Sequence, residues 1–258
     1  MTDDEPQQPG VKTTETIVEI IETLRDLDGA SAATLSDHLG MSRSWTYEHL
    51  VTLEKLEYVV NEDGTYRLGL RFLDHGKYVK SRMRIHQLVQ SSIAHLAEET
   101  GELVRFGVEE HGRVFQLNEA AGERAVAVDR WLGEHTHMHY LALGKSMLAY
   151  MPESRVREIL DRHGLPEMTN ETITDEGKLF DELEEIRERD GISFIDSELE
   201  AGVRAVGAPI IHSEDIVGAI SVSGPANRLK GPLFRETIPE QIRATTNEVE
   251  LKLLTELE

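Results

Sequence analysis

Residues 30–71 constrain this chain more than any other stretch, because their caps and their glycine place two short helices at a sharp turn. Ser31 can cap a first helix, and Gly40 ends it. Ser42 can cap a second helix only two residues later, and this helix is expected to run to about Leu56. Two helices that follow each other so closely must cross steeply, so the pattern predicts a helix-turn-helix.

A hairpin is predicted directly after the second helix. The short runs 57–60 and 65–68 are typical of strands, and Asn61-Glu62-Asp63-Gly64 between them is a turn signal. A hairpin in this position is the wing of a winged helix-turn-helix. The alternative is a small helical bundle with a hairpin whose polar residues are only solvated.

The outward side of the second helix is the predicted DNA-binding surface. Thr46, Leu50 and Leu53 recur at helical spacing and are expected to face the core. The first turns of a recognition helix meet base edges, where arginine reads guanine, while hydroxyls more often bond phosphate oxygens. The expected DNA contacts are Ser42, Arg43, Ser44, Trp45 and Tyr47 on the helix, with Arg67 on the wing.

The net charge of -21 is unfavourable for a protein that binds DNA phosphates. Residues 41–84, however, carry eight basic and six acidic side chains, so the acidic excess lies elsewhere. Arginine outnumbers lysine 19 to 8, and acidic residues are spread throughout, as in proteins from a cytoplasm with molar salt. At about 1 M salt the Debye length is about 3 Å, so distant carboxylates hardly oppose DNA binding. We therefore expect a halophilic source.

Length and composition fit a cytoplasmic chain of one large domain or two smaller ones. The 258 residues are enough for a sizeable core, and no cysteine is present that would need an oxidising compartment. No apolar run approaches the roughly 18 residues of a membrane helix, so no membrane partner is expected. Residues 1–10 are acidic and rich in Gln and Pro, which favours a disordered tail over a signal peptide.

Periodicity divides the rest of the chain. We expect a winged helix-turn-helix over residues 11–69, a linker helix within 70–83, and a second domain over 84–258. Further helices are predicted at 85–100, 144–150, 152–163, 175–190 and 239–257, and strands at 103–109, 114–119, 125–129, 192–195, 205–211 and 216–223. Strands and helices in this order predict an α+β domain around a mainly antiparallel sheet.

Three stretches together resemble the isocitrate lyase regulator (IclR) family of transcription factors. They are residues 40–53 with Tyr58-Val59-Val60, residues 138–149 (the family's His-x-x-Ala-x-Gly-Lys-x-x-Leu-Ala run), and residues 198–210 with 218–225 and Arg228. The match covers nearly the whole chain, in order. It implies a winged helix joined by a helix to a GAF-like effector domain, a dimer or tetramer on a palindromic operator, and no catalysis or cofactor.

The resemblance also places an effector pocket. It would fall on Ala142, Leu143, Asp196, Ala205, Ser221 and Ser223. The chain departs from the family at Trp45, where threonine is frequent, at Glu48, where a basic residue is frequent, and near Ala205, where some members have cysteine. The effector class expected is a small organic acid, a sugar derivative or an aromatic metabolite.

The residues themselves support part of this pocket. Ser221 and Ser223 are two apart on a predicted strand and would share a face, where they could hold a carboxylate, or else bond only to neighbouring backbone. Gly144 at a predicted helix start would leave backbone N–H groups free for an anion, and Lys145 beside it adds a charge or is merely solvated. Asp196, Glu198 and Glu200 alternate, so they could bind a ligand hydroxyl or a metal, or form a solvated run.

Three histidines give an alternative function. His135, His137 and His139 would share one face of a strand, which is a feasible zinc site and would allow a metal-dependent hydrolase with Glu134 or Asp129 as base. No nucleophile motif accompanies them. The resemblance accounts for His139 without metal, so we include it with Gly144 and Glu198 among the expected effector residues, and we expect no metal ligand.

Overall fold

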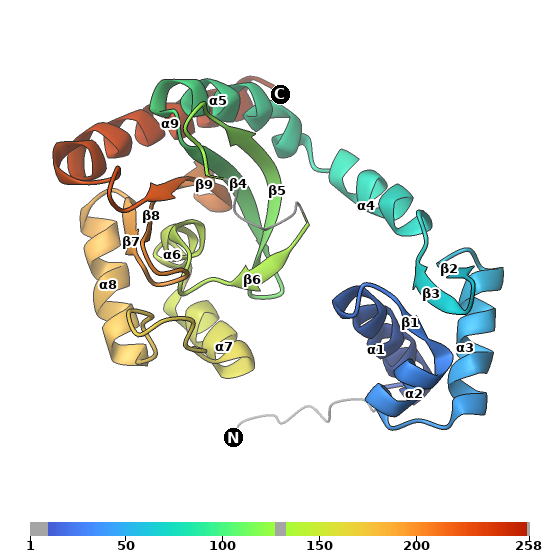
Figure 1. Cartoon of the computed structure of the whole chain (residues 1–258). Coiled ribbons are helices and arrows are strands. Elements are labelled where there is room, and N and C mark those ends of the chain that lie inside the picture. Colours follow the sequence, from blue (N-terminus) through green and yellow to red (C-terminus); the bar gives the residue numbers. More distant parts are fainter. Residues whose placement is uncertain (1–9, 127–132, 257–258) are drawn as a thin grey trace. The chain divides into compact units, whose positions relative to one another are not determined.

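The structure is a computed structural model that describes residues 10–126 and 133–256 (Figure 1). It forms two compact units, Met1–Val79 and Lys80–Glu258, which divide within the predicted linker. The expected disordered tail lies outside the described residues, apart from Gly10. Within the described residues, no helix is both long enough and apolar enough to cross a membrane.

The first unit is a winged helix-turn-helix. Its helices are α1 (Lys12–Asp26), α2 (Ala32–Leu39) and α3 (Arg43–Lys55), and its sheet has the order β1 (Ala30–Ser31), β3 (Thr65–Leu68), β2 (Val59–Glu62). The predicted caps are confirmed: Ser31 accepts the Thr34 N–H at 3.1 Å, and Ser42 accepts the Trp45 N–H at 3.3 Å. Gly40 has the left-handed φ of 66° that ends α2. The turn between α2 and α3 is therefore fixed by local chemistry.

The wing is longer than the turn signal indicated. Asn61 and Glu62 continue β2 and pair with Tyr66 and Thr65, so only Asp63 and Gly64 form the turn. Asp63 has φ 51° and Gly64 has φ 90°, as a two-residue type I′ turn requires. The two-residue strand β1 was not predicted, because so short a run shows no alternation.

The linker helix α4 (Arg71–Ser81) begins against the wing. The Phe72 ring packs edge-on against Tyr58 with centroids 5.2 Å apart, and the Tyr58 hydroxyl lies 2.9 Å from His75 Nε2. Arg71 also bonds the Glu57 carboxylate at 3.1 Å. No residue of α4 is buried in the single chain. These contacts join the first turns of α4 to the base of the hairpin.

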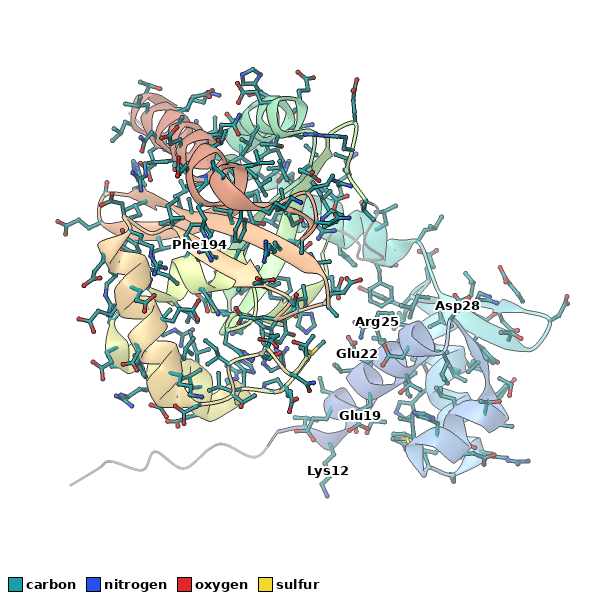
Figure 2. The ribbon with its side chains drawn as sticks, turned by 60° about the vertical axis from the view of Figure 1, so that its left-hand side comes forward. Lys12, Glu19, Glu22, Arg25, Asp28 and Phe194 are labelled. Carbon is teal, nitrogen blue, oxygen red and sulfur yellow. The ribbon has the colours of Figure 1, made fainter. Side chains whose placement is uncertain are left out.

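The outer side of α1 carries part of the acidic excess. Figure 2 shows Lys12, Glu19, Glu22 and Arg25 along this helix, with Glu22 and Arg25 joined by an ion pair of 2.6 Å. The opposite side supplies Ile20 and Leu24 to the core of the unit. The charges of α1 thus cover a small apolar core.

The second unit is built on one antiparallel sheet with the order β6 (His135–His137), β5 (Arg113–Ala121), β4 (Leu103–Glu110), β9 (Asp215–Pro225), β8 (Val203–His212), β7 (Ser193–Asp196). Helices α5 (Arg84–Thr100) and α9 (Ile238–Glu256) cover one face, and α9 follows a π-helical turn (Leu233–Thr237). Helix α6 (Ala142–Leu148) packs on the other face, with α7 (Glu153–His163) and α8 (Glu176–Glu188) beyond it (Figure 1). The predicted α+β architecture is confirmed.

Two predicted elements are wrong in detail. Ala125 and Val126 belong to no strand, because Ala125 N–H bonds to Gly122 O in a turn, and the remainder of the predicted strand 125–129 lies outside the described residues. The helix predicted from Gly144 begins earlier, at Ala142. The other helices and strands lie within a few residues of their predicted positions.

Candidate DNA interface and effector pocket

The outer side of α3 is exposed in the part of the chain that the structure describes. Thr46, Leu50 and Leu53 are buried as predicted, whereas Arg43 and Tyr47 are exposed. Ser42 is occupied as the cap, and Ser44 lies 3.5 Å from the Glu48 carboxylate. The N-terminal turns of α3 thus present a cation, hydroxyls and an aromatic ring, the groups that meet bases and phosphates in a recognition helix.

Trp45 does not project freely. Its ring lies 3.7 Å from that of His49, and His49 Nδ1 lies 2.9 Å from the Trp45 carbonyl one turn earlier. Sequence reasoning missed His49, although the spacing of four residues was a usable signal. The two rings are tilted by 37° and form one aromatic contact along α3.

Arg67 is held within its own unit. Its guanidinium lies 3.1 Å from the Asp28 carboxylate and 3.3 Å from that of Glu62, and it also bonds the Asp28 carbonyl. Arg67 was expected to contact DNA from the wing, but here it joins β3 to the turn that follows α1. A contact with DNA phosphate would require it to leave these carboxylates.

A small cavity of about 50 Å³ lies between the sheet and the start of α6. Five residues expected in the effector pocket line it: Ala142, Leu143, Ala205, Ser221 and Ser223. Glu200, which alternates with Asp196 and Glu198 in the sequence, also lines it. Other lining residues were not foreseen: Arg105, Gln116, Tyr140, Leu141, Ile195, Leu199 and Val203. An arginine inside the otherwise apolar run of β4 was the signal that sequence reasoning passed over.

Strand register brings the polar residues together. Arg105 on β4 is paired with Ser221 on β9, and Ser223 is paired with Ala205 on β8. Since facing partners lie on the same side of a sheet, their side chains share the face that carries α6. Gly207 allows α6 to approach, because a Cβ there would lie 2.5 Å from the Ala142 carbonyl.

Several polar side chains that line this cavity are buried or partly buried. Arg105 is 7% exposed; its Nε donates to Glu119 at 2.8 Å, while its Nη2 has no partner among the described residues. Ser223 Oγ donates to the Leu103 carbonyl at 3.5 Å, the backbone bond foreseen as an alternative. Gln116 and Ser221 are also buried, 3% and 6% exposed. Buried polar groups are normally paired, so the unpaired Arg105 Nη2 distinguishes this cavity.

Four residues expected in the pocket do not line it. His139 Nε2 lies 3.1 Å from the Pro166 carbonyl, and burial lowers the pKa of His139 to about 4. Gly144 lies against the backbone of Met138, where a Cβ would come within 2.1 Å of the carbonyl oxygen. Asp196 bonds Arg204 at 2.7 Å, which lowers the pKa of Asp196. The fourth, Glu198, is used in an ion pair.

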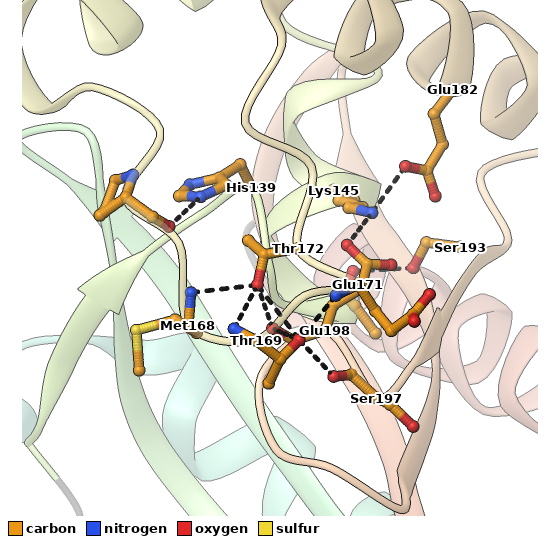
Figure 3. Close-up of polar contacts among 12 residues, drawn as sticks. His139, Lys145, Met168, Thr169, Glu171, Thr172, Glu182, Ser193, Ser197 and Glu198 are labelled. Carbon is orange, nitrogen blue, oxygen red and sulfur yellow. Dashed lines mark hydrogen bonds and ion pairs between the residues drawn. The ribbon is translucent and has the colours of Figure 1, made fainter.

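Lys145 is neither solvated nor at an anion site. It is fully buried, and its Nζ lies 2.6 Å from Glu182 and 2.7 Å from Glu198 (Figure 3). Burial raises the pKa of Glu198 to about 6, against the opposing effect of Lys145. One cation therefore holds two carboxylates from distant parts of the chain.

The loop between β7 and β8, which contains Glu198, is also held through its backbone. Thr169 donates to the Ser197 carbonyl at 2.7 Å, and Thr172 donates to the Glu198 carbonyl at 2.6 Å (Figure 3). Leu199 and Glu200, which follow directly, line the cavity. The ion pairs of Lys145 and the two threonine hydrogen bonds thus hold the loop whose next residues form one wall of the cavity.

The histidine hypothesis is not supported. Strand β6 ends at His137, so His139 lies in the following turn, and the two rings meet edge-on with centroids 5.7 Å apart. Burial lowers the pKa of His137 to about 4 as well. Within the described part of the chain, no group of three histidine or acidic side chains could hold a metal ion.

An exposed recognition helix with a wing, followed by a domain with a small, mainly apolar cavity that also holds a few polar side chains, is typical of one class of protein: regulators that bind DNA and carry their own sensing domain. Sequence profiles give the family. The profile of the bacterial transcriptional regulator IclR C-terminal domain matches residues 77–251, and that of the IclR helix-turn-helix domain matches residues 15–63. The chain belongs to the IclR family of transcription regulators.

Relatives cover nearly the whole chain. A probable HTH-type transcriptional regulator ArcR of Halobacterium salinarum is 29% identical over 243 residues, 92% of each chain, and fits the halophilic composition. The crystal structure of Thermotoga maritima IclR has a TM-score of 0.74 at 27% identity, covering 94% of this chain and 98% of that one. An IclR homologue from Microbacterium hydrocarbonoxydans, crystallised with 4-hydroxybenzoate, shares the fold with a TM-score of 0.76 at 19% identity over 93% and 99% of the two chains.

Proposed function

We propose that this transcription regulator is controlled by a small metabolite bound between α6 and the sheet, in the cytoplasm of a halophile. The observation that supports the proposal most is a cavity lined by Arg105, whose buried Nη2 has no partner among the described residues. A ligand that binds this cavity more tightly in one quaternary arrangement of the protein than in another increases the population of the first arrangement. The 4-hydroxybenzoate bound by the Microbacterium homologue supports a small-molecule ligand in this family.

The proposed DNA contacts are Ser42, Arg43, Ser44, Trp45 and Tyr47, with Arg67 joining them once released from Asp28. Arg43 is the side chain best suited to read a guanine, because it is exposed in the first turn of α3. We expect the Arg43→Ala variant to bind the DNA upstream of the gene that encodes this protein about 5- to 150-fold more weakly than the wild type does.

A mobility-shift titration in molar potassium chloride measures this loss. Arg25→Ala is the matched control, since Arg25 is an exposed arginine on α1, away from the recognition helix. Equal DNA affinity of Arg43→Ala and wild type in this titration would reject α3 as the recognition helix.

We further propose a homodimer, or a tetramer made of two such dimers, on a palindromic operator. Four apolar side chains at the linker helix are more than half exposed in the single chain: Leu70, Leu73, Tyr78 and Val79. A second copy covering them would place two recognition helices on half-sites about 34–36 Å apart.

Light scattering tests the dimer. We expect Leu73→Glu to give a smaller species, whereas Val18→Glu, at an exposed position of α1, leaves the mass unchanged. Equal masses for wild type and Leu73→Glu would remove α4 from the interface.

A further inference from the structure

The middle of the outer side of α3 carries an acidic residue, Glu48. It is two residues away from both Thr46 and Leu50, which are buried. At about 100° per residue, Glu48 lies about 160° around the helix from each of them, so it projects almost directly away from the core. Glu48 is exposed, in agreement with this position. In a recognition helix, this is the side that faces the base edges of the major groove.

No basic residue of α3 is placed to neutralise Glu48. Ion pairs on a helix join residues three or four apart, and these positions hold Ser44, Trp45, Val51 and Thr52. The Glu48 carboxylate instead accepts a hydrogen bond from the Ser44 hydroxyl at 3.5 Å. In contrast, Glu57 and Glu62 of the hairpin are each paired with an arginine. Because phosphates repel a carboxylate, Glu48 weakens DNA binding unless it meets a hydrogen-bond donor there.

The chemistry of the major groove limits this donor. Only adenine N6 and cytosine N4 offer N–H groups there, whereas guanine and thymine offer acceptors. Adenine also places its N7 lone pair beside N6, which repels a carboxylate, while cytosine itself has no acceptor on this edge. Resting on the proposed function, we infer that Glu48 determines specificity by accepting a hydrogen bond from the N4 amino group of one cytosine in each half-site.

Glu48 also rejects the wrong bases. Opposite guanine or thymine, the carboxylate would lose water and meet only acceptors, which is unfavourable. In molar salt the Debye length is about 3 Å, so repulsion from more distant phosphates is weak, whereas the contact with a base is hardly screened. Glu48 thus costs little affinity and adds discrimination between bases.

Selection of bound sequences from a randomised duplex library, with the full-length protein in molar potassium chloride, tests the inference. We expect the wild type to prefer cytosine at one position of each half-site by at least about fivefold. Glu48→Gln should change the preference at this position to adenine, because a carboxamide binds adenine N6 and N7 together. Glu48→Ala should accept all four bases there. Identical preferences for the three proteins would overturn the inference.

The matched control is Glu54→Gln, which removes the same charge from an exposed position six residues further along α3. We expect this variant to keep every base preference of the wild type. If Glu54→Gln changed the preferences as Glu48→Gln does, net charge alone would be responsible, and the contact between Glu48 and cytosine would be excluded.

A base analogue tests the hydrogen bond itself. Replacing the selected cytosine by 2-pyrimidinone removes the N4 amino group. We expect the wild type to lose at least about fivefold more affinity than Glu48→Ala does, because the weaker base pair affects both proteins alike. Equal losses for the two proteins would show that Glu48 does not contact this group.

The same assays separate this inference from the proposed function. If Arg43→Ala loses DNA affinity while both Glu48 variants keep the base preferences of the wild type, α3 is the recognition helix and the role of Glu48 fails. If Arg43→Ala and the wild type bind the same sequences equally well, and the Glu48 variants do too, α3 does not read DNA and both proposals fail.

Discussion

The two faces of the six-stranded sheet are made by the same strands but do different work. On β4, Val104 and Phe106 face α5 and α9, while Arg105 between them faces the cavity. On β9, Ile220 and Val222 join the apolar face, while Ser221 lies opposite Arg105. Large apolar side chains secure the first face, and small or polar ones leave room on the second. Apolar packing and the lining of the proposed pocket thus fall on alternate residues of the same strands.

The largest expected effect is on the apolar face. Phe106→Ala removes a fully buried ring, so we expect the free energy of unfolding to fall by about 4 kcal/mol. Chemical denaturation in high salt measures this. Leu251→Ala, at an exposed position of α9, should change it by less than about 0.5 kcal/mol. A loss below about 1 kcal/mol at Phe106 would show that this face does not carry the stability of the domain.

The next effect concerns the buried cation behind the polar face. Lys145→Met leaves the carboxylates of Glu182 and Glu198 close together without their cation, and should cost about 3 kcal/mol at pH 7. Adding Glu198→Gln should restore part of the loss, since one buried charge is removed. If the double variant were no more stable than the single one, the loss would come from packing and not from charge.

The pH dependence of stability isolates Glu198. Its folded pKa of about 6 lies above the ordinary value of 4.5, so its contribution is fully present below about pH 4.5 and is lost as the pH rises to 6. The expected loss is about 2 kcal/mol over this window. His139, with a pKa lowered to about 4, acts oppositely and loses its contribution as the pH falls below 6.5.

The difference in unfolding free energy between wild type and Glu198→Gln, taken at each pH, therefore isolates Glu198, because both proteins carry the same histidines. We expect the wild type to lose stability relative to the variant between pH 4.5 and 6. A constant difference between the two proteins would show that Glu198 titrates normally.

The smallest effect should come from adjacent residues of β9. Ser221→Ala removes a hydroxyl without a described partner, so we expect a change within about 0.5 kcal/mol, whereas Val222→Ala should cost about 2 kcal/mol. Thermal and chemical unfolding of the two variants measure the contrast. Similar losses at both positions would mean that the polar face is as important for stability as the apolar one.

Sequence predicted what depends on neighbouring residues. The caps Ser31 and Ser42, the turn at Gly40 and the buried positions of α3 follow from spacing within one or two helical turns. The alternation of β9 likewise placed Ser221 and Ser223 on one face of the sheet, and both line the cavity.

Contacts between distant segments could not be predicted in this way. Lys145 meets Glu198 across 53 positions, and nothing near either residue indicates the pairing. Arg105 and Gln116 required the order of the strands, because only this order shows which side of β4 and β5 faces α6. His139 was assigned to a strand that ends two residues earlier, since period-two spacing continues into the turn.

The contact of Phe72 and His75 with Tyr58 has a mechanical consequence. The first turns of α4 are attached by these contacts to the base of the β2–β3 hairpin. Bending between these turns and the hairpin would have to break an aromatic contact and a hydrogen bond, so the first turns of α4 and the wing move as one piece.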